Sequence, residues 1–266
     1  TPGSVLFWDM VVLNGYLFLN LLVGWVTLEA ERQQTMPPKW IKTFIYLSII
    51  WAFSIHTVTA FLYAGLPGRH YFLTAIMAAR FLSSAFCSGP AILLILAFVL
   101  KKLTRFDPGK EAICTLAKII TYAMCINVFF YCLELFTAFY SGIPGHAHPI
   151  VYLFSGEGDK TQWVPFMWTA ATLAILSLVL LIPSKLRDNH DLLPWTLVLL
   201  VIASWIDKGI GLLVGGFSPN MFHGITEYVP TVPELLVSLG VFAIGGMILT
   251  VLWKIAVEVK KEAGTF

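Results

Sequence analysis

Charge is scarce in this chain of 266 residues. Asp, Glu, Lys and Arg make up 12% of it, whereas 58% of its residues are hydrophobic and its mean hydropathy is +0.81. Soluble domains carry about 25% charged residues, so the composition argues against a cytoplasmic enzyme and against a disordered tail. The net charge of +2, from 17 basic and 15 acidic residues, is too balanced for a surface that binds nucleic-acid phosphates. The composition predicts a polytopic membrane protein.

Ligands for metals and redox centres are also few. The cysteines form no C-x-x-C pair and lie in apolar stretches, as small buried hydrophobic residues do: Cys87, Cys114, Cys125 and Cys132. A di-haem cytochrome b needs four histidines within its helices, and only His56 lies in an apolar run. His146 and His148 form an H-x-H pair, but two ligands without a third make a weak metal site. We therefore predict no metal site, haem or iron–sulfur cluster in this chain.

Long apolar runs, in contrast, fill the sequence. A helix that crosses a bilayer needs about 20 mostly apolar residues, and breaks rich in Pro, Gly and charge separate seven such runs. The predicted spans are Val5–Leu28, Trp40–Ala64, Phe72–Leu100, Ala112–Tyr140, Trp163–Ile182, Leu192–Phe217 and Pro233–Val257. The predicted fold class is an all-α integral membrane protein, a polytopic bundle of about seven transmembrane helices.

Lys and Arg are distributed unequally between the predicted loops. Thirteen of the 17 lie in or beside the odd-numbered loops and the C-terminal tail, whereas the even-numbered loops hold only Arg69 and Lys160. Because cytoplasmic loops carry an excess of Lys and Arg, we predict that the odd loops face the cytoplasm and that residue 1 lies on the outer side. An outer start with an odd number of spans, and Thr1 in place of an initiator Met, lead us to expect further spans before this segment.

A few ionisable side chains fall inside the predicted spans, where each is costly and is a functional candidate by default. In the predicted orientation the strongly polar ones all lie in the outer half of the membrane, whereas the inner halves are almost purely apolar apart from Lys residues near the span ends, such as Lys118, which can snorkel. The strongly polar ones are Asp9, His56, Arg80, Glu134, Asp207 and Lys208. Together they predict an amphipathic cavity in the outer leaflet, suited to a lipophilic molecule whose polar head exchanges protons.

Each of these residues also has a purely structural interpretation. His56 is equally typical of a hydrogen-bonded core histidine. Asp9 is suited to capping the first turn of its helix, and the Asp-Lys pair at 207–208 to anchoring a helix at the membrane interface. Arg80 suits a salt bridge with Glu134 or with Asp9. The clustering on one side of the membrane favours the functional interpretation for the group as a whole.

Short motifs surround these candidates. They are Phe7-Trp8-Asp9-Met10 with Asn14-Gly15-Tyr16, SIHTVTAF at 54–61, ARFLSSAF at 79–86 with Ser88-Gly89-Pro90, WIDKG at 205–209 and EYVPTVPE at 227–234. In these motifs the sequence resembles the NrfD/PsrC family of polysulfide reductase membrane subunits, over nearly the whole chain. Within the family it is most similar in character to the P subunit of the sulfite-reduction-associated DsrMKJOP complex, with the Hmc complex second.

The resemblance implies a cofactor-free, quinone-interacting subunit of the four-helix-bundle type. Such proteins pass electrons from quinol to an iron–sulfur subunit on the outer face of the membrane. His56 matches the histidine that contacts the quinone, here menaquinone as bound substrate. The resemblance assigns the lining or support of this site to further polar positions, which are Asp9, Tyr16, Arg80, Glu134, Asp207 and Glu227. The larger family members have more than seven spans, so we expect 1–266 to be a single NrfD-like transmembrane domain with N-terminal spans missing.

The predicted function is that of a menaquinol-interacting subunit, without a redox cofactor of its own, in a respiratory oxidoreductase complex of sulfur metabolism. Histidine has an ordinary pKa near neutrality, so His56 would exchange a proton with the quinone oxygen, and Asp9 or Glu134 would pass it outward. Electrons would leave to a ferredoxin-like iron–sulfur subunit. Further expected partners are a multihaem cytochrome c, cytochrome b-type membrane subunits and membrane lipid, in the cytoplasmic membrane.

Two other classes stay open. A proton-coupled secondary transporter or ion pathway would use the same carboxylates, and inverted repeats and helices broken at mid-membrane would indicate it. A passive assembly anchor whose quinone site has decayed would tolerate the loss of His56.

The last outer loop, residues 216–232, has no Lys or Arg and contains the apolar side chains Phe217, Met221, Phe222, Ile225, Tyr228 and Val229. An exposed segment rich in aromatic residues and Met is typical of a protein contact surface. We therefore predict that this loop docks the iron–sulfur subunit. The competing interpretation is a loop folded back over its own helices.

Overall fold

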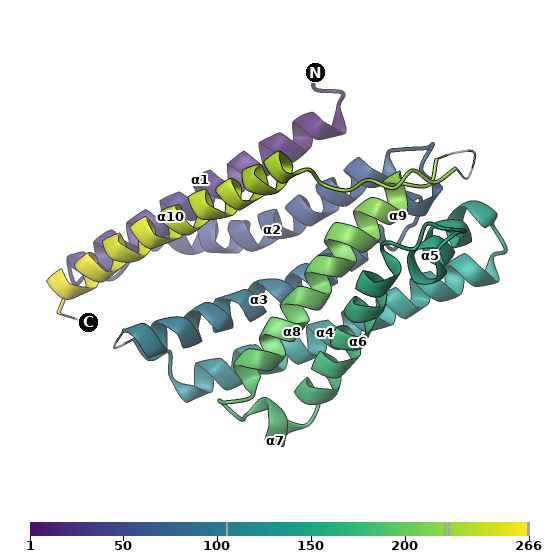
Figure 1. Ribbon diagram of the computed structural model, residues 1–266. Coiled ribbons are helices and arrows are strands. Elements are labelled where there is room, and N and C mark those ends of the chain that lie inside the picture. Colours follow the sequence, from purple (N-terminus) through teal and green to yellow (C-terminus); the bar gives the residue numbers. More distant parts are fainter. Residues whose placement is uncertain (105, 221, 223, 265–266) are drawn as a thin grey trace. The chain divides into compact units, whose positions relative to one another are not determined.

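The computed structural model describes residues 1–104, 106–220, 222 and 224–264, and Figure 1 shows the course of its helices. The elements are α1 (Val5–Arg32), α2 (Ile41–Ala64), η1 (His70–Phe72), α3 (Met77–Leu103), α4 (Lys110–Tyr140), α5 (Pro144–Ser155), α6 (Val164–Leu181), α7 (Ser184–Arg187), α8 (Leu193–Ile206), η2 (Asp207–Leu212), α9 (Leu213–Phe217) and α10 (Val232–Glu262). Within the described chain, seven segments are long and apolar enough to cross a membrane, with α8, η2 and α9 counted together. The predicted all-α, multi-pass membrane class is confirmed.

All seven predicted spans coincide with observed helices, although α1 and α10 continue to Arg32 and Glu262, four and five residues beyond the predicted ends, and two outer loops differ from the prediction. The third span begins at Met77 and not at Phe72, because His70–Phe72 forms a separate 3-10 turn. The long loop after the fourth span contains the additional helix α5, which the pattern of apolar runs does not predict. Arg105 and Met221, which entered the predictions of orientation and docking, lie outside the described residues.

Apolar side chains, together with the need to pair every backbone N–H and C=O inside a bilayer, dictate helices in this chain. Three long helices carry proline in their first turn: Pro165 in α6, Pro194 in α8 and Pro233 in α10. The first turn has no helical partner for an N–H, so proline costs nothing there. Thr231 and Glu234 form a capping box at the start of α10, which satisfies two backbone N–H groups.

The chain divides into two compact units, a terminal unit of Thr1–Val58 and Tyr228–Phe266 and a central unit of Thr59–Glu227. In the central unit, α3, α4, α6 and α8 pack as a four-helix bundle. Small side chains of α3 face larger ones of the other helices in its core, which lets the helices approach closely. This core contains Cys87, Ala91, Leu94, Ile113, Ala117, Ile120, Met124, Leu181, Leu193, Leu197 and Leu200. The four-helix-bundle type implied by the resemblance is therefore present.

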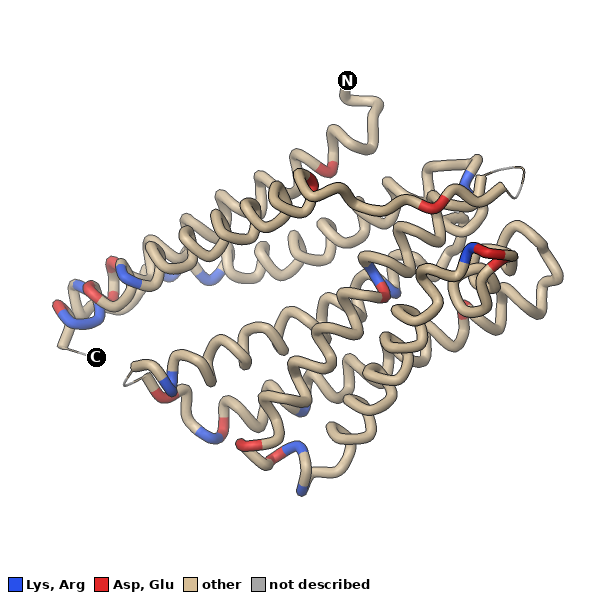
Figure 2. The backbone as a smooth tube through the Cα atoms, viewed as in Figure 1, with Lys and Arg blue, Asp and Glu red and all other residues tan. Residues whose placement is uncertain are grey.

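Three even-numbered loops meet at one end of the central unit. Arg69 Nη1 donates hydrogen bonds to the carbonyl oxygens of Phe217 at 2.8 Å and Pro219 at 2.9 Å. Lys160 Nζ donates to the carbonyl oxygen of Ile225. Loops two, four and six therefore gather at the same end, as helices that alternate in direction require. Most charged residues of this unit lie at the ends of its helices, with one group inside the bundle (Figure 2).

Loop six is only partly exposed. Ile225 is 7% exposed and packs with Tyr152, Leu153 and Met167, so the prediction that Ile225 lies on an exposed surface is wrong. The bond from Lys160 draws this stretch of backbone onto α5 and α6. The aromatic residues of the loop are exposed, as predicted: Phe217, Phe222 and Tyr228, with Val229 beside them.

In the terminal unit, α1 and α10 lie side by side and run in the same direction (Figure 1). Their C-terminal ends are joined by an ion pair between Lys260 and Glu31 at 2.8 Å, and by a hydrogen bond from Gln34 Nε2 to the Ala263 carbonyl oxygen at 2.5 Å. The first and seventh spans therefore cross in the same sense, as an odd number of crossings requires.

Candidate functional site

An ion cluster lies inside the central unit, where α3, α4 and the end of α8 meet. The guanidinium of Arg80, a residue only 2% exposed, donates through Nη1 to the Glu134 carboxylate and through Nη2 to both Asp207 carboxylate oxygens, at 3.1 and 3.0 Å. Lys208 Nζ lies 3.6 Å from Asp207 Oδ2. Two cations thus balance two carboxylates, which offsets the cost of removing these charges from water. The structure selects Glu134 as a salt-bridge partner of Arg80 and adds Asp207.

The backbone of the sixth span is irregular at this cluster. Residues Asp207–Leu212 form a π-helix between α8 and α9. The wider π-helical turn re-aims the side chains that follow it and is frequent at functional sites. Here it carries Asp207, which pairs with Arg80, and Lys208, whose Nζ lies 5.2 Å from the ring centroid of Phe81. The 207–208 pair therefore belongs to the interior of the bundle and does not act as an interface anchor.

A cavity of about 550 Å³ adjoins the ion cluster, between α4, α5, α6 and α8. Its volume is within the range of small-molecule sites, about 300–1,000 Å³. Asp207 lines the cavity and joins it to the ion cluster, and so does Tyr131, whose ring centroid lies 5.0 Å from Arg80 Cζ. Most of the lining is apolar or aromatic and includes Leu135, Phe139, Ile150, Phe154, Met167 and Trp168.

Few polar groups line this cavity, and one of them is an unsatisfied donor. Ser204 Oγ is buried and has no hydrogen-bond partner among the residues that the structure describes. Asn127 also lines the cavity, and its Oδ1 accepts a hydrogen bond from Ser83 Oγ at 3.3 Å. A buried polar group without a partner marks a place where a ligand atom or water can bind. An apolar slot that ends at a hydroxyl, a phenol and a carboxylate suits a planar apolar ring with oxygen substituents.

Asp9, Tyr16 and His56 belong to the terminal unit. Trp51 Nε1 on α2 donates to the carbonyl oxygen of Val12 on α1 at 2.8 Å, which fixes the register of these antiparallel helices. His56 lies five residues beyond Trp51, and Asp9 three residues before Val12, so both are displaced toward the same end, by about 7.5 and about 4.5 Å. Asp9 and His56, both half-buried, thus lie at the same level of the pair. Tyr16 lies nearer the level of Trp51.

Glu227 is placed with the loops of the central unit and not in the ion cluster. Its Oε1 accepts hydrogen bonds from the Tyr152 hydroxyl and from the Gln162 backbone N–H, at 3.4 Å each. Burial, together with the Glu227 carboxylate, raises the pKa of Tyr152 to about 12. Glu227 therefore fastens loop six to α5 and to the start of the fifth span.

The uncharged part of the cavity lining is not evident from the sequence pattern. On α4, Asn127, Tyr131 and Glu134 recur at intervals of four and three residues, which places them on one helix face. That spacing, taken together with the buried Glu134, could have found the first two. Ser204 on α8 and Trp168 on α6 carry no comparable local signal, because only the packing of the bundle brings them to the cavity.

Comparison with known proteins places most of this chain in one group. Residues 1–217 match the family described as "Polysulphide reductase, NrfD". The chain is also similar to a putative membrane subunit of dimethyl sulfoxide reductase from Halobacterium salinarum, with 23% identity over 236 residues. The alignment covers 74% of this chain and 49% of the relative, so the chain spans about half the relative's length. The family match includes six spans and every predicted site residue except Glu227.

Proposed function

The chain belongs to the polysulphide reductase NrfD family, and from this membership we propose that it is a quinol-interacting membrane subunit of a reductase complex. The relative from Halobacterium salinarum is itself described as a reductase membrane subunit, which supports the proposal that this chain is part of a reductase complex. In its finer form the proposal is a menaquinol-interacting subunit of a respiratory complex of the DsrMKJOP type. The complex would lie in the cytoplasmic membrane, with the quinol site toward the outer face.

One observation carries the proposal: an apolar cavity ends at a buried and balanced cluster of ionisable groups. A quinol has an apolar ring and tail, and its two hydroxyl groups lose protons on oxidation. The cavity of about 550 Å³ supplies the apolar surface, and Asp207 and Tyr131 supply the polar end. Buried ionisable groups beside a cavity are the usual mark of a site that handles protons.

Ser204, Asp207 and Arg80 of the central unit have different roles in the proposed chemistry. A bound quinol supplies two electrons and two protons when it is oxidised. Ser204 Oγ is placed to donate a hydrogen bond to an oxygen on the ring, and Asp207 to accept a proton from it. Arg80 holds the carboxylates of Asp207 and Glu134 in place through its ion pairs with both.

The resemblance matches His56 to the histidine that contacts the quinone and Asp9 to a polar position of the same region. We propose that the imidazole exchanges a proton with a quinone oxygen and that Asp9, which lies at the same level of α1 and α2, or Glu134 passes it outward. Tyr16, on the same helix as Asp9, would support this region.

The electrons need an acceptor outside this chain. We propose a ferredoxin-like iron–sulfur subunit, with a multihaem cytochrome c and cytochrome b-type membrane subunits as further partners. The exposed side chains of Phe217 and Phe222, which are 46% and 87% exposed, support a contact with such a subunit at loop six.

Filling the cavity tests the proposal. Ala171 on α6 lines the cavity, whereas Ala243 on α10 is exposed in the terminal unit. In membranes that contain the whole complex, Ala171→Phe should raise the KM for a short-chain menaquinol by about tenfold, because the added ring occupies part of the cavity that the quinol needs. The readout is quinol-dependent reduction of the partner's redox centres, and Ala243→Phe should leave it unchanged.

Two results would contradict the proposal. The first is a wild-type KM in an assembled Ala171→Phe complex. The second is proton uptake by the wild-type complex in the absence of quinol, which would favour the proton-coupled transporter.

A further inference from the structure

Tyr71 lies between the ion cluster and the end of the central unit where the even-numbered loops meet. It belongs to the 3-10 turn η1, is 8% exposed, and packs in a core with Phe72, Met77 and Leu212. Its hydroxyl interacts with the Arg80 guanidinium. Burial, followed by the charge of Glu134, raises the pKa of Tyr71, so the phenol stays protonated over the whole physiological range.

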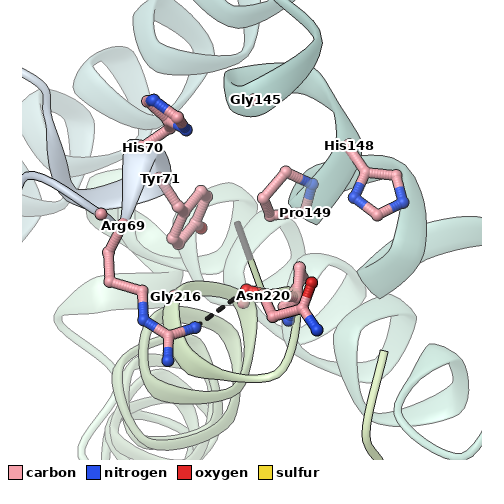
Figure 3. A pocket seen from close by; sticks show the side chains of 11 residues that line it. Arg69, His70, Tyr71, Gly145, His148, Pro149, Gly216 and Asn220 are labelled. Atoms are coloured by element: carbon pink, nitrogen blue, oxygen red, sulfur yellow. Dashed lines mark hydrogen bonds between the residues drawn. The ribbon is translucent and has the colours of Figure 1, made fainter. Parts of the chain in front are cut away.

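On its other side, Tyr71 lines a small polar pocket. Figure 3 shows the ring of Tyr71 between Arg69 and Pro149, with His70 and His148 around the same space. The pocket has a volume of about 20 Å³, and about 10–15 Å³ is enough for one water molecule. Segments of all three even-numbered loops and the end of α9 form its wall. The lining residues are Gly68, Arg69, His70, Tyr71, Gly145, His148, Pro149, Gly215, Gly216, Pro219 and Asn220.

We propose that Tyr71 is the proton outlet of the ion cluster: its hydroxyl takes up a proton from the Glu134 side and gives its own proton to water in the small pocket. This inference rests on the proposed function, because it presumes that quinol oxidation delivers protons to the cluster. A phenol that donates while it accepts never has to ionise, which agrees with its protonated state. His70 and His148 are the titratable groups at the pocket that can receive the proton next.

Each turnover conserves atoms and electrons. Oxidation of one quinol to quinone sends two electrons, one at a time, to an iron–sulfur or haem acceptor of the partner and releases two protons, and a proton taken up by a carboxylate of the cluster leaves through Tyr71. Each passage through Tyr71 breaks its O–H bond on the pocket side and forms a new one on the cluster side, so the residue ends as a neutral phenol. Rotation of the hydroxyl about its C–O bond then restores the starting orientation, and each passage releases one proton to the pocket.

Tyr71→Phe removes the hydroxyl and keeps the buried ring. In the whole membrane complex, this variant should lower the rate of short-chain menaquinol oxidation at saturating quinol by roughly 10- to 100-fold, as the loss of a proton-transfer group does. KM should stay at the wild-type value. Added imidazole buffer should restore much of the rate, because a mobile base can replace a missing relay but cannot repair a packing defect. Tyr63→Phe is the matched control, since Tyr63 packs against the same core and stacks on Phe81 at 5.8 Å.

A second substitution tests the proposal even if the Tyr71→Phe complex does not assemble. Incorporation of 3,5-difluorotyrosine at position 71 keeps the shape of the side chain and makes the phenol more acidic. The pH profile of the rate should then shift, which a purely structural role does not produce. A wild-type rate in Tyr71→Phe, a slow rate without imidazole rescue, or an unchanged pH profile in the fluorinated protein would each overturn the outlet. The proposed function fails separately, if the wild-type complex does not oxidise quinol or if Ala171→Phe leaves KM unchanged.

Discussion

The two units of this chain solve the problem of a membrane protein in different ways. The central unit buries charge: Arg80, Glu134 and Asp207 pair inside a bundle that also contains a buried apolar core. In the terminal unit, α10 has no buried residue, and the ion pairs lie at helix ends, as between Lys260 and Glu31. Because lipid tails accept apolar side chains, exposed Leu, Ile and Val need no protein partner in a bilayer. The contrast teaches that the buried ion pairs of this chain lie where helices pack against one another, whereas an apolar helix face can be left to lipid.

The largest expected effect follows from breaking the buried cluster. Arg80→Leu should lower the stability of the central unit by about 3–5 kcal/mol, because two buried carboxylates lose their main counter-charge. Thermal unfolding of the purified complex in detergent measures this loss. Arg32, whose pair with Glu29 is exposed in the terminal unit, gives the control Arg32→Gln, which should unfold like the wild type. Equal unfolding temperatures for both variants would remove the distinction between the units.

The next effect concerns activity in the terminal unit. His56→Ala should lower quinol-dependent reduction of the partner's redox centres by roughly 100-fold, because a general acid–base group is lost, while the complex still assembles. Ser48→Ala on the same helix is the control, since the Ser48 hydroxyl is exposed and donates its hydrogen bond to the Ile45 carbonyl oxygen, three residues earlier in the same helix. Wild-type turnover in an assembled His56→Ala complex would confine the proton chemistry to the central unit and would favour the passive-anchor interpretation for the terminal unit.

The sequence predicted the spans well because the length of an apolar run is a local property. It also found Arg80, Glu134 and Asp207, because charges inside such runs are conspicuous. It left the partner of Arg80 open between Glu134 and Asp9. It did not pair Arg80 with Asp207, because these residues are 127 positions apart and only the packing of α3 against α8 brings them together.

Uncharged features escaped for the same physical reason. Ser204 and Trp168 are ordinary residues of transmembrane helices until the cavity gives them a role. The helix α5 depends on the packing of Tyr152 and Leu153 beneath loop six, and the buried Ile225 depends on the same contact. The π-helix at Asp207–Leu212 leaves no trace in hydropathy, because it changes the turn of the backbone and not the apolar run.

Two glycines, one in each unit, give a smaller expected effect on stability. A Cβ at Gly216 in the central unit would overlap the fully buried ring of Phe72, whereas a Cβ at Gly240 in α10 would meet nothing within 4 Å. Gly216→Ala should therefore cost about 1–3 kcal/mol through overpacking, and Gly240→Ala should be neutral or slightly stabilising because Ala favours a helix. Unfolding in detergent compares the two. A neutral Gly216→Ala would show that this end of the bundle can relax around Phe72.

The smallest expected effect compares two tyrosine–glutamate pairs, one in each unit. Tyr152 donates to Glu227 in the central unit and is buried, and Tyr228 donates to Glu234 in the terminal unit and is exposed. The Glu234 carboxylate raises the pKa of Tyr228 by accepting this bond, and burial together with Glu227 raises the pKa of Tyr152 to about 12. A phenol whose pKa is higher in the folded than in the unfolded chain, where it is about 10, stabilises the fold below that unfolded value. The stabilisation is lost as the pH rises from about 10 to about 12.

Tyr152→Phe should accordingly cost about 1 kcal/mol at neutral pH, the worth of one hydrogen bond. The difference in unfolding temperature between Tyr152→Phe and the wild type should shrink as the pH rises through this window. The wild type then loses the stabilisation from the protonated Tyr152 hydroxyl, which the variant lacks at every pH. Tyr228→Phe should show a smaller change at every pH, since water replaces an exposed bond. The measurement is a pair of unfolding series in detergent between pH 7 and pH 12. If both variants gave the same profile, burial would not distinguish the two pairs, and Glu227 would not fasten loop six to α5 more firmly than Glu234 holds the start of α10.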